Sequence, residues 1–223
     1  MNIDLLVKES IKANLDKNKK RSSLKKIGIM GGTFDPIHYA HLATAEFIRI
    51  KYNLDKILFI PSGNPPHKTN RAIMDKCHRY NMVLLSTMTN ENFEVSSIEI
   101  DKDEKTYTVD TLRKLNLIYP DSELYFITGA YAICDIESWR DVEENFKLAT
   151  FIAATRPGIS LIKAQDKIEK LREKYSANIL TIYVPSLDIS STYIREQIKE
   201  NNSVRYLIPE NVEKYIHEKL LYK

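Results

Sequence analysis

One stretch decides the fold of this chain: Ile27-Gly28-Ile29-Met30-Gly31-Gly32-Thr33-Phe34-Asp35-Pro36-Ile37-His38-Tyr39-Ala40-His41. Residues 27–30 form a short apolar run that stops at a glycine pair, a pattern typical of a buried strand. Asp35-Pro36 predicts a turn, with Asp35 as a helix cap and Pro36 suited to a first helical turn. A helix is expected from His38 onward, because apolar residues recur there at helical spacing: Leu42, Ala45, Phe47, Ile48 and Tyr52.

Strand, glycine turn and helix N-terminus together predict an anion site. Bare glycine backbone lets a phosphate approach closely, while unpaired N–H groups and the helix dipole face it. His38 and His41 are three residues apart, hence on one face of the first helical turn. As imidazolium groups they would stabilise charge that develops in phosphoryl or nucleotidyl transfer. Two weaker alternatives are a merely packed pair and a metal site, for which no third ligand is evident nearby.

This stretch resembles the signature of nucleotidyltransferases with an H-x-G-H motif, specifically that of the bacterial nicotinate mononucleotide adenylyltransferases. The resemblance rests on Gly-Gly-Thr-Phe-Asp-Pro-Ile-His-x-x-His, and with further motifs in the expected order it covers about residues 24–223. The chain departs from the family at Ala40, where glycine is usual. The resemblance implies that backbone groups of four residues contact the nucleotides: Gly31, Gly32, Thr33 and Phe34. It implies that His38, His41 and Arg195 stabilise the triphosphate and the departing pyrophosphate.

Length and composition indicate a globular protein with a sizeable core. The 223 residues are 43% hydrophobic and 28% charged, which is ordinary, and a net charge of +3 is too small to argue for nucleic acid. Two cysteines, Cys77 and Cys134, suit a reducing compartment better than a disulfide framework. The sequence shows neither a signal peptide nor an apolar run of membrane-spanning length, so we expect a cytoplasmic protein.

Residues 1–23 are expected to be a leader, and residues 24–223 a single nucleotidyltransferase domain. The leader begins with apolar residues at roughly helical spacing: Ile3, Leu5, Leu6, Ile11 and Leu15. This predicts an amphipathic helix packed on the domain or on a partner, with the basic run Lys17–Arg21 as a solvated linker. A tail that binds RNA or a membrane is a weaker alternative.

Alternating strand and helix patterns predict an α/β fold, a doubly wound and mostly parallel Rossmann-like sheet flanked by helices. In such sheets ligands bind beyond the carboxyl ends of the strands. Residues 56–61 form a second apolar strand, and the loop Pro65-Pro66-His67-Lys68 leaves at that edge. The loop resembles the family's second motif, which implies that Lys68 lies near phosphate and His67 near nicotinate mononucleotide.

Further elements follow from periodicity and turn residues. Helices are expected at residues 71–90, with Met74, Cys77, Met82, Leu85 and Met88 as its apolar positions, after residue 106, at 161–175 and near the C-terminus. Strands are expected at residues 93–95, 98–100, 124–128, 148–154 and 179–184.

Two segments concern the nicotinate group. Thr106-Tyr107-Thr108 opens a helix with hydroxyl groups, which physical chemistry alone interprets as an N-cap. By resemblance it is the Tyr-Thr-x-Asp-Thr segment, which helps to hold the nicotinate carboxylate. Trp139 is the only tryptophan and by itself would be read as a packed residue. By resemblance it stacks on the pyridine ring.

On the adenosine side of the predicted site, the chain departs a second time from the family pattern. Gly129-Ala130-Tyr131 occupies the place of the family's Gly-Ala-Asp, so a tyrosine replaces an aspartate that lies among the nucleotide-contacting groups. Asp135, four residues later, is a candidate substitute. Gly129 stays a nucleotide-binding residue by resemblance, and the strand-end position of Arg156 indicates an adenosine contact.

Ile189-Ser190-Ser191-Thr192-Tyr193-Ile194-Arg195 predicts a second anion site. Hydroxyl groups crowd a helix N-terminus, and Arg195 follows one turn later on the same face. By itself this would be an ordinary capped helix. It resembles the Ile-Ser-Ser-Thr-x-Ile-Arg motif of the family, which implies that Ser191 and Thr192 hold ATP phosphates below the guanidinium of Arg195.

The resemblance therefore implies transfer of AMP from ATP to nicotinate mononucleotide, giving nicotinate adenine dinucleotide and pyrophosphate in NAD biosynthesis. Mg²⁺ would arrive on the ATP phosphates and not in a dedicated protein site. We expect these two nucleotides as partners, with no nucleic acid and no membrane, and with a homodimer left open. The alternatives are a sister enzyme for nicotinamide mononucleotide or phosphopantetheine and a nucleotide-binding regulator without catalysis, which Tyr131 and Ala40 would favour.

Overall fold

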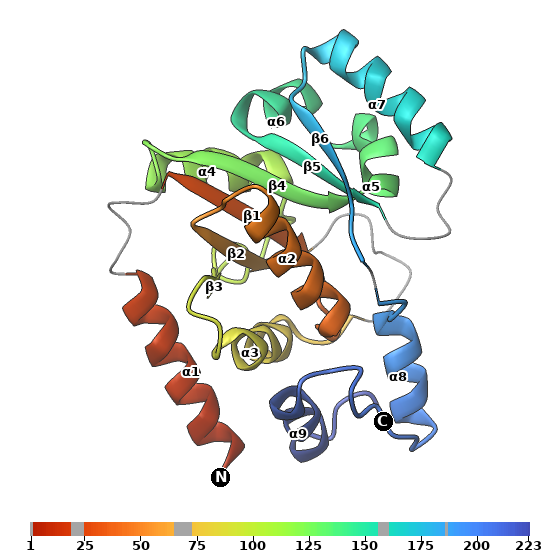
Figure 1. The fold of residues 1–223 in the computed structure, drawn as a ribbon. Coiled ribbons are helices and arrows are strands. Elements are labelled where there is room, and N and C mark those ends of the chain that lie inside the picture. The colour runs from red at the N-terminus through yellow and green to blue at the C-terminus, as the bar shows by residue number, and fades with distance from the viewer. Residues whose placement is uncertain (1, 19–24, 65–72, 156–160, 186) are drawn as a thin grey trace.

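Six parallel strands form one sheet in the order β3-β2-β1-β4-β5-β6 (Figure 1). A computed structural model describes residues 2–18, 25–64, 73–155, 161–185 and 187–223. The strands are β1 (Lys26–Gly32), β2 (Lys56–Pro61), β3 (Phe93–Val95), β4 (Glu123–Gly129), β5 (Thr150–Thr155) and β6 (Ile179–Tyr183). The predicted α/β class is confirmed. The order reverses between β1 and β4, and ligands of such sheets bind beyond the carboxyl ends at this point.

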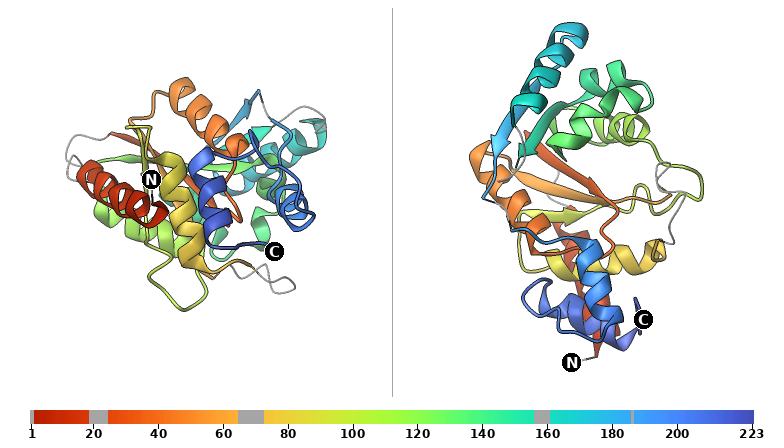
Figure 2. Two further views of the ribbon diagram at one scale, coloured as in Figure 1. Left: turned by 90° about the horizontal axis from the view of Figure 1, so that it is seen from below. Right: turned by 90° about the vertical axis from the view of Figure 1, so that its right-hand side faces the viewer.

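Helices cover both faces of the sheet (Figure 2). On one face lie α1 (Ile3–Asn18), α2 (Tyr39–Lys51), α3 (Lys76–Thr87), α8 (Ser191–Lys199) and α9 (Glu210–Glu218). On the other lie α4 (Thr108–Ile118), α5 (Ala130–Cys134), the short 3₁₀ helix η2 (Ile136–Ser138), α6 (Val142–Leu148) and α7 (Leu161–Tyr175).

The structure has one hydrophobic core on each face of the sheet, and the alternation of side chains along the strands explains both. In β2, Ile57 and Phe59 pack on the α2 face, whereas Leu58 and Ile60 pack on the α4 face. Successive side chains of a strand point to opposite faces, so a strand covered on both sides reads as a continuous apolar run. This is why residues 56–61 were recognisable as a buried strand.

Helix α1 lies against α3, α9 and the edge strand β3. Ile3 and Leu6 are buried in the core of this face, whereas Leu15 is exposed. The amide of Asn14 pairs with the backbone of Val95 on β3, donating to its carbonyl and accepting from its N–H, both at 2.8 Å. The side chain thus occupies hydrogen-bonding groups that an edge strand otherwise leaves open. The basic run of residues 19–21 lies outside the described residues.

One predicted strand was wrong, and one predicted helix was too long. Ile98–Ile100 is a turn and not a strand, because hydrogen bonds from Asp101 N to Ser97 O and from Lys102 N to Glu99 O curl the chain away from the sheet. Helix α3 begins at Lys76 and not at residue 71. Asp75 caps it by accepting from Cys77 N at 2.8 Å, which leaves Cys77 exposed instead of on the apolar face.

The start of α2 also differs from the prediction. His38 is the N-cap residue, and the helix begins at Tyr39, so Asp35 and Pro36 lie outside the helix. Asp35 is buried, with 5% of its surface exposed, and its carboxylate accepts from the Tyr222 hydroxyl at 2.8 Å. A long-range partner therefore replaces the local capping role that sequence alone suggests.

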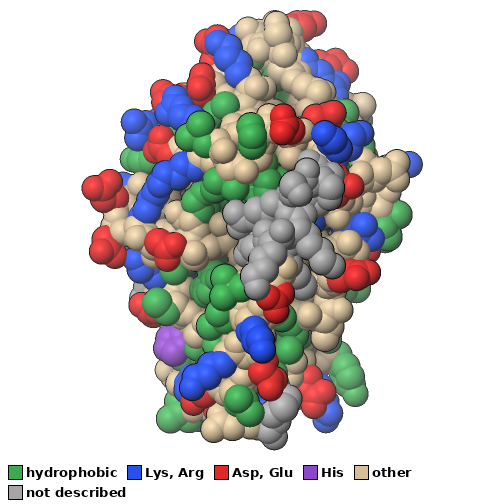
Figure 3. Space-filling view, turned by 90° about the vertical axis from the view of Figure 1, so that its left-hand side faces the viewer, with side chains coloured by type: hydrophobic (Ala, Val, Ile, Leu, Met, Phe, Trp, Pro, Cys, Tyr) green, Lys and Arg blue, Asp and Glu red, His purple; other side chains and the backbone are tan. Residues whose placement is uncertain are grey.

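The surface in Figure 3 carries both signs of charge. Lys and Arg side chains are interspersed with Asp and Glu on this face. Within the described ranges, no helix has the length and apolar character needed to cross a membrane.

Candidate active site

A first cavity, here called cavity A, has a volume of about 420 Å³ and opens at the carboxyl ends of β1 and β2 beside the start of α4. Seven of its lining residues were predicted from the sequence: Gly31, Gly32, Thr33, Thr106, Tyr107, Thr108 and Trp139. Sequence reasoning missed four polar residues that also line it: Ser62, Glu99, Thr128 and Arg140. Arg140 directly follows Trp139, and this adjacency was the one signal that could have found it.

A second cavity, cavity B, has a volume of about 460 Å³ and lies between the start of α2, the end of β4 and the start of α8. Five predicted residues line it: Gly31, His38, His41, Gly129 and Ser191. Both departures from the family pattern, Ala40 and Tyr131, also line it. Apolar residues after β6 complete the wall: Val184 and Leu187, which carried no motif signal, and Ile189, the first residue of the predicted Ile-Ser-Ser-Thr-x-Ile-Arg motif.

The two cavities share Gly31 and Thr128. Cavity A is lined by Ile29 and Phe126, which belong to the core of the α4 face, whereas cavity B is lined by Met30 and Ile127 of the α2 face. The cavities therefore lie on opposite faces of the sheet and meet at the ends of β1 and β4. A Cβ at Gly31 would meet the Phe126 ring at 3.5 Å, so protein packing alone does not require glycine there.

Three predicted residues that the structure describes line neither cavity: Phe34, Thr192 and Arg195. Phe34 is buried beneath the site, with its ring edge-on to His41 at 5.1 Å. Thr192 accepts a hydrogen bond from Nη2 of Arg195 at 2.9 Å, and both belong to α8 beyond the wall of cavity B. His67, Lys68 and Arg156 lie outside the described residues.

The two histidines stack on each other, with ring centroids 3.7 Å apart. His41 Nδ1 accepts the backbone N–H of His38 at 3.3 Å, so the proton of a neutral His41 ring lies on Nε2. Burial, with a smaller contribution from His38, lowers the pKa of His41 well below its usual value. Burial therefore favours a neutral His41 ring, whereas the sequence analysis expected an imidazolium.

Helix α8 is tied to the loop between β1 and α2. Ser190 caps the helix by accepting from Tyr193 N at 3.1 Å, and Ser191 Oγ donates to the carbonyl of Pro36 at 2.9 Å. Nη1 of Arg195 donates to the carbonyl of Asp35. These bonds bring the second predicted anion site beside the first.

A buried hydroxyl group near the start of α4 is available to a ligand. Tyr107 is the N-cap residue and makes no side-chain capping bond, so the predicted hydroxyl cap is wrong. The hydroxyl of Thr106 is buried and has no hydrogen-bond partner within the part of the chain that the structure describes. The guanidinium of Arg140 lies 4.9 Å from the centre of the Tyr107 ring. Buried hydroxyls normally have partners, so this end of cavity A suits a polar ligand group.

A buried arginine, Arg79 of α3, joins the two loops that carry Thr33 and Ser62 of cavity A. Its guanidinium donates to the carbonyls of Thr33 at 2.7 Å, Ser62 at 2.7 Å and Gly63 at 3.2 Å, and to that of Met74 at 2.9 Å. The side chain is 1% exposed. No pattern around residue 79 indicated this role, because its partners are backbone groups of distant segments.

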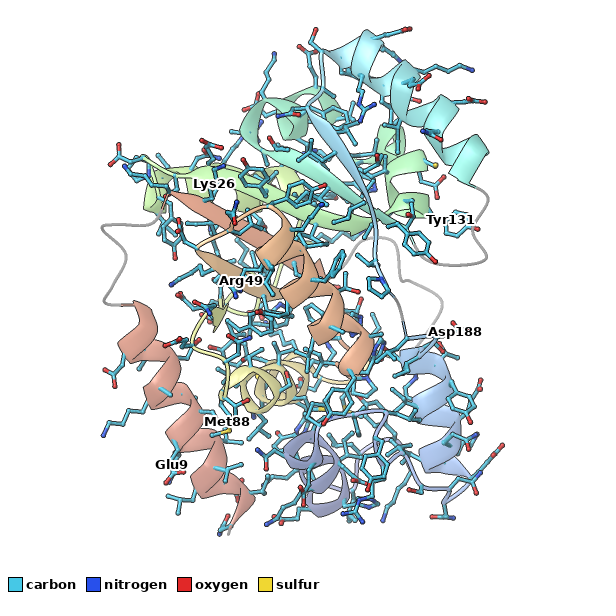
Figure 4. All side chains as sticks on the ribbon, in the orientation of Figure 1. Glu9, Lys26, Arg49, Met88, Tyr131 and Asp188 are labelled. Carbon is cyan, nitrogen blue, oxygen red and sulfur yellow. The ribbon has the colours of Figure 1, made fainter. Side chains whose placement is uncertain are left out.

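Tyr131 stands at the rim of cavity B. It is the second residue of α5, directly beyond the carboxyl end of β4, and 63% of its surface is exposed (Figure 4). An exposed ring here changes the chemistry of the cavity rim without disturbing the core.

Comparison with known proteins agrees with this geometry. The cytidylyltransferase-like family matches residues 29–197, a range that includes both histidines and Arg195. The chain belongs to the cytidylyltransferase-like family. The resemblance to nucleotidyltransferases that the motifs indicated is thereby confirmed.

Relatives within the cytidylyltransferase-like family share most of the chain. "Probable nicotinate-nucleotide adenylyltransferase" of Thermoanaerobacter sp. (strain X514) is 50% identical over 89% of this chain and 94% of that protein. The protein of the same name from Desulfitobacterium hafniense (strain Y51) is 46% identical over 89% of this chain and 96% of that protein. Plasmodium falciparum nicotinic acid mononucleotide adenylyltransferase complexed with NaAD has a TM-score of 0.71 at 26% identity, covering 89% and 97% of the two chains.

The lowered pKa of His41 predicts a pH dependence of stability in this cytidylyltransferase-like protein. Below about pH 6.5 the unfolded chain binds a proton at this residue that the folded chain excludes, so stability falls as pH falls. His41→Asn should remove this component, which has a limiting slope of about 1.4 kcal/mol per pH unit. Urea unfolding of both proteins between pH 7.5 and 5.5 measures the difference. Parallel pH profiles would contradict the prediction.

Arg79→Met should destabilise the protein strongly, by about 3–5 kcal/mol, because four buried or partly buried carbonyl groups lose their charged donor. Arg49→Met is the matched control. Arg49 pairs with Glu46 at 2.8 Å on the surface of α2, so its loss should cost less than about 1 kcal/mol. Urea unfolding at pH 7.5 measures both changes. Equal losses of stability in the two variants would show that Arg79 contributes no more than an exposed ion pair does.

Proposed function

We propose that this enzyme transfers AMP from ATP to nicotinate mononucleotide, forming nicotinate adenine dinucleotide and pyrophosphate in NAD biosynthesis. The observation that carries the proposal is the pair of cavities that meet at Gly31 and Thr128. A dinucleotide has two base-bearing halves joined by phosphates. Two cavities on opposite faces of the sheet, with Gly31 and Thr128 between them, suit the two halves and their junction. The names of the relatives support the same substrates.

We assign nicotinate mononucleotide to cavity A. Trp139 contributes an aromatic wall, and Phe126 holds it edge-on with ring centroids 6.0 Å apart. The N-terminus of α4 and the buried Thr106 hydroxyl offer hydrogen-bond donors, and Arg140 adds positive charge. These groups favour a carboxylate over a neutral amide. Tyr107 and Thr108 line the same end, and His67 completes the set proposed for this nucleotide.

We assign ATP to cavity B. His38, His41 and Ser191 line its wall, and Gly129 leaves open space where a Cβ would lie. Arg195 follows Ser191 by one helical turn, so its guanidinium is proposed to contact the triphosphate outside the cavity wall. Gly32, Thr33 and Phe34 are proposed to contribute backbone groups near the phosphates. Thr192, Lys68 and Arg156 complete the proposed ATP-binding residues.

The reaction needs no protein nucleophile. A phosphate oxygen of the mononucleotide, already ionised, forms a bond to the α-phosphorus of ATP. The bond from that phosphorus to the bridging oxygen breaks, and its electron pair leaves with pyrophosphate. The protein's contribution is to align the two nucleotides and to stabilise the charge that develops on the phosphate oxygens. A neutral His41 does so by donating Nε2–H, while Arg195 supplies a permanent positive charge.

We propose that Mg²⁺ enters with ATP. Among the residues that the structure describes, no three His, Cys, Asp or Glu side chains gather into a metal-binding group. We expect the ion to be held chiefly by phosphate oxygens and water, which is the usual mode for magnesium bound with a nucleotide. When bound, the ion would neutralise charge on the triphosphate.

We also propose that the enzyme works in the cytoplasm. Cys77 and Cys134 are both free thiols, and a reducing compartment keeps thiols in this state.

The direct test measures pyrophosphate release with ATP and magnesium, offering nicotinate mononucleotide and its amide in parallel. We expect release with both nucleotides and a preference for the acid, because cavity A offers donors and a cation to the carboxylate. His41→Ala should lower turnover by about 100-fold or more, as loss of a charge-stabilising donor does. Near-normal turnover of this variant would refute its catalytic role. Absence of release from folded wild-type protein would refute the function.

Gly31→Ala tests the proposed site with little effect on the stability of the fold. The added methyl group has room against Phe126, so the free energy of unfolding should change by less than about 1 kcal/mol. It would occupy the junction of the two cavities, and kcat/KM should fall by about tenfold or more. Gly28→Ala is the matched control on the same strand. Its Cβ would lie 2.5 Å from Ile57 Cδ1, so stability should fall there. Full activity of Gly31→Ala would contradict the proposed junction.

A further inference from the structure

The segment after α9 reaches back to the loop between β1 and α2. Leu220 and Tyr222 adopt left-handed backbone conformations, with φ of 55° and 64°, and the Leu221 side chain between them is buried. This anchoring directs Tyr222 inward, where it packs on the core of the α2 face. Its hydroxyl donates to Asp35 Oδ1 at 2.8 Å.

Asp35 also faces Arg195. Its second carboxylate oxygen, Oδ2, lies 3.9 Å from Nη1 of Arg195, at the outer limit of an ion pair. The same Nη1 donates to the backbone carbonyl of Asp35, and Nη2 donates to Thr192. The guanidinium is thus held beside a buried carboxylate at the long end of ion-pair distance.

The distance between these charges matters for an anion-binding arginine. Attraction between a carboxylate and a guanidinium grows steeply as they approach in a partly buried site. A close, bidentate pair would use the same N–H groups that a phosphate needs. A hydrogen bond that holds the carboxylate back therefore favours phosphate binding.

We propose that Tyr222 is a positioning residue, which holds the Asp35 carboxylate away from Arg195 so that the guanidinium stays directed at the phosphates of the nucleotide. The inference rests on the proposed role of Arg195 in binding the triphosphate. Burial, reinforced by Asp35, raises the pKa of Tyr222 well above its ordinary value, so the hydroxyl remains a donor throughout the working pH range.

The test is a cycle of Tyr222→Phe and Asp35→Asn, read by titrating inorganic pyrophosphate in the presence of magnesium and by the KM for ATP. Without the hydroxyl, Asp35 can close on Arg195. Tyr222→Phe should therefore raise the dissociation constant of pyrophosphate and the KM for ATP about fivefold to tenfold. The KM for nicotinate mononucleotide should stay within about twofold. In the Asp35→Asn background the same substitution should have less than about a twofold effect, because the competing charge is absent.

Tyr125→Phe is the matched control. Tyr125 also donates to a carboxylate, Glu123 Oε2 at 2.7 Å, and it lines neither cavity. Its removal should leave pyrophosphate affinity within about twofold of wild type. An unchanged affinity in Tyr222→Phe would overturn the inference. So would an equal loss in the Asp35→Asn background, since Tyr222 would then act by packing alone. Pyrophosphate binding is measured without turnover, so an inactive wild-type enzyme would refute the proposed function and leave this test readable.

Discussion

The whole site depends on one buried cation. Arg79 lies inside the protein, and its guanidinium is satisfied by four backbone carbonyls instead of a carboxylate. Three of these carbonyls belong to the segments that leave β1 and β2, in which Thr33 and Ser62 line cavity A. A buried guanidinium is tolerated only where its donors have partners, so these segments must keep their positions for the protein to remain folded.

That constraint acts at the place where the strand order reverses. The chain leaves β1 toward β2 on one side, while β4 begins the second half of the sheet on the other. Because consecutive connections diverge there, the ends of β1 and β4 stay uncovered, and both cavities open at them. Gly31 and Thr128 lie at this point from neighbouring strands. Small or polar side chains at the junction leave room for a phosphate chain between the two halves of a dinucleotide.

Electrostatics in the site result from burial as much as from charge. His41 is neutral because its ring is desolvated and stacked on His38, so it offers a hydrogen bond and not a charge. Arg195 keeps its charge, which no ordinary site removes. Its neighbour Asp35 is restrained by the Tyr222 hydroxyl. The proposed site thus combines a neutral donor with a permanent cation, an arrangement suited to binding polyanions.

The sequence by itself determined the features that depend on neighbouring residues. Apolar runs located β1 and β2, helical spacing located α2, and local motifs singled out His38, His41 and the start of α8, whereas Trp139 was singled out by the family resemblance. These signals are local because strand alternation, helix periodicity and capping involve residues a few positions apart. Tertiary structure alone decided the rest. Arg79 binds carbonyls up to 46 residues away, and Tyr222 reaches Asp35 across 187 residues. Tertiary contacts also gave Asp35 a long-range partner in place of a cap and made His41 neutral. Burial and long-range hydrogen bonds depend on which segments meet in the folded chain, and no local pattern records that.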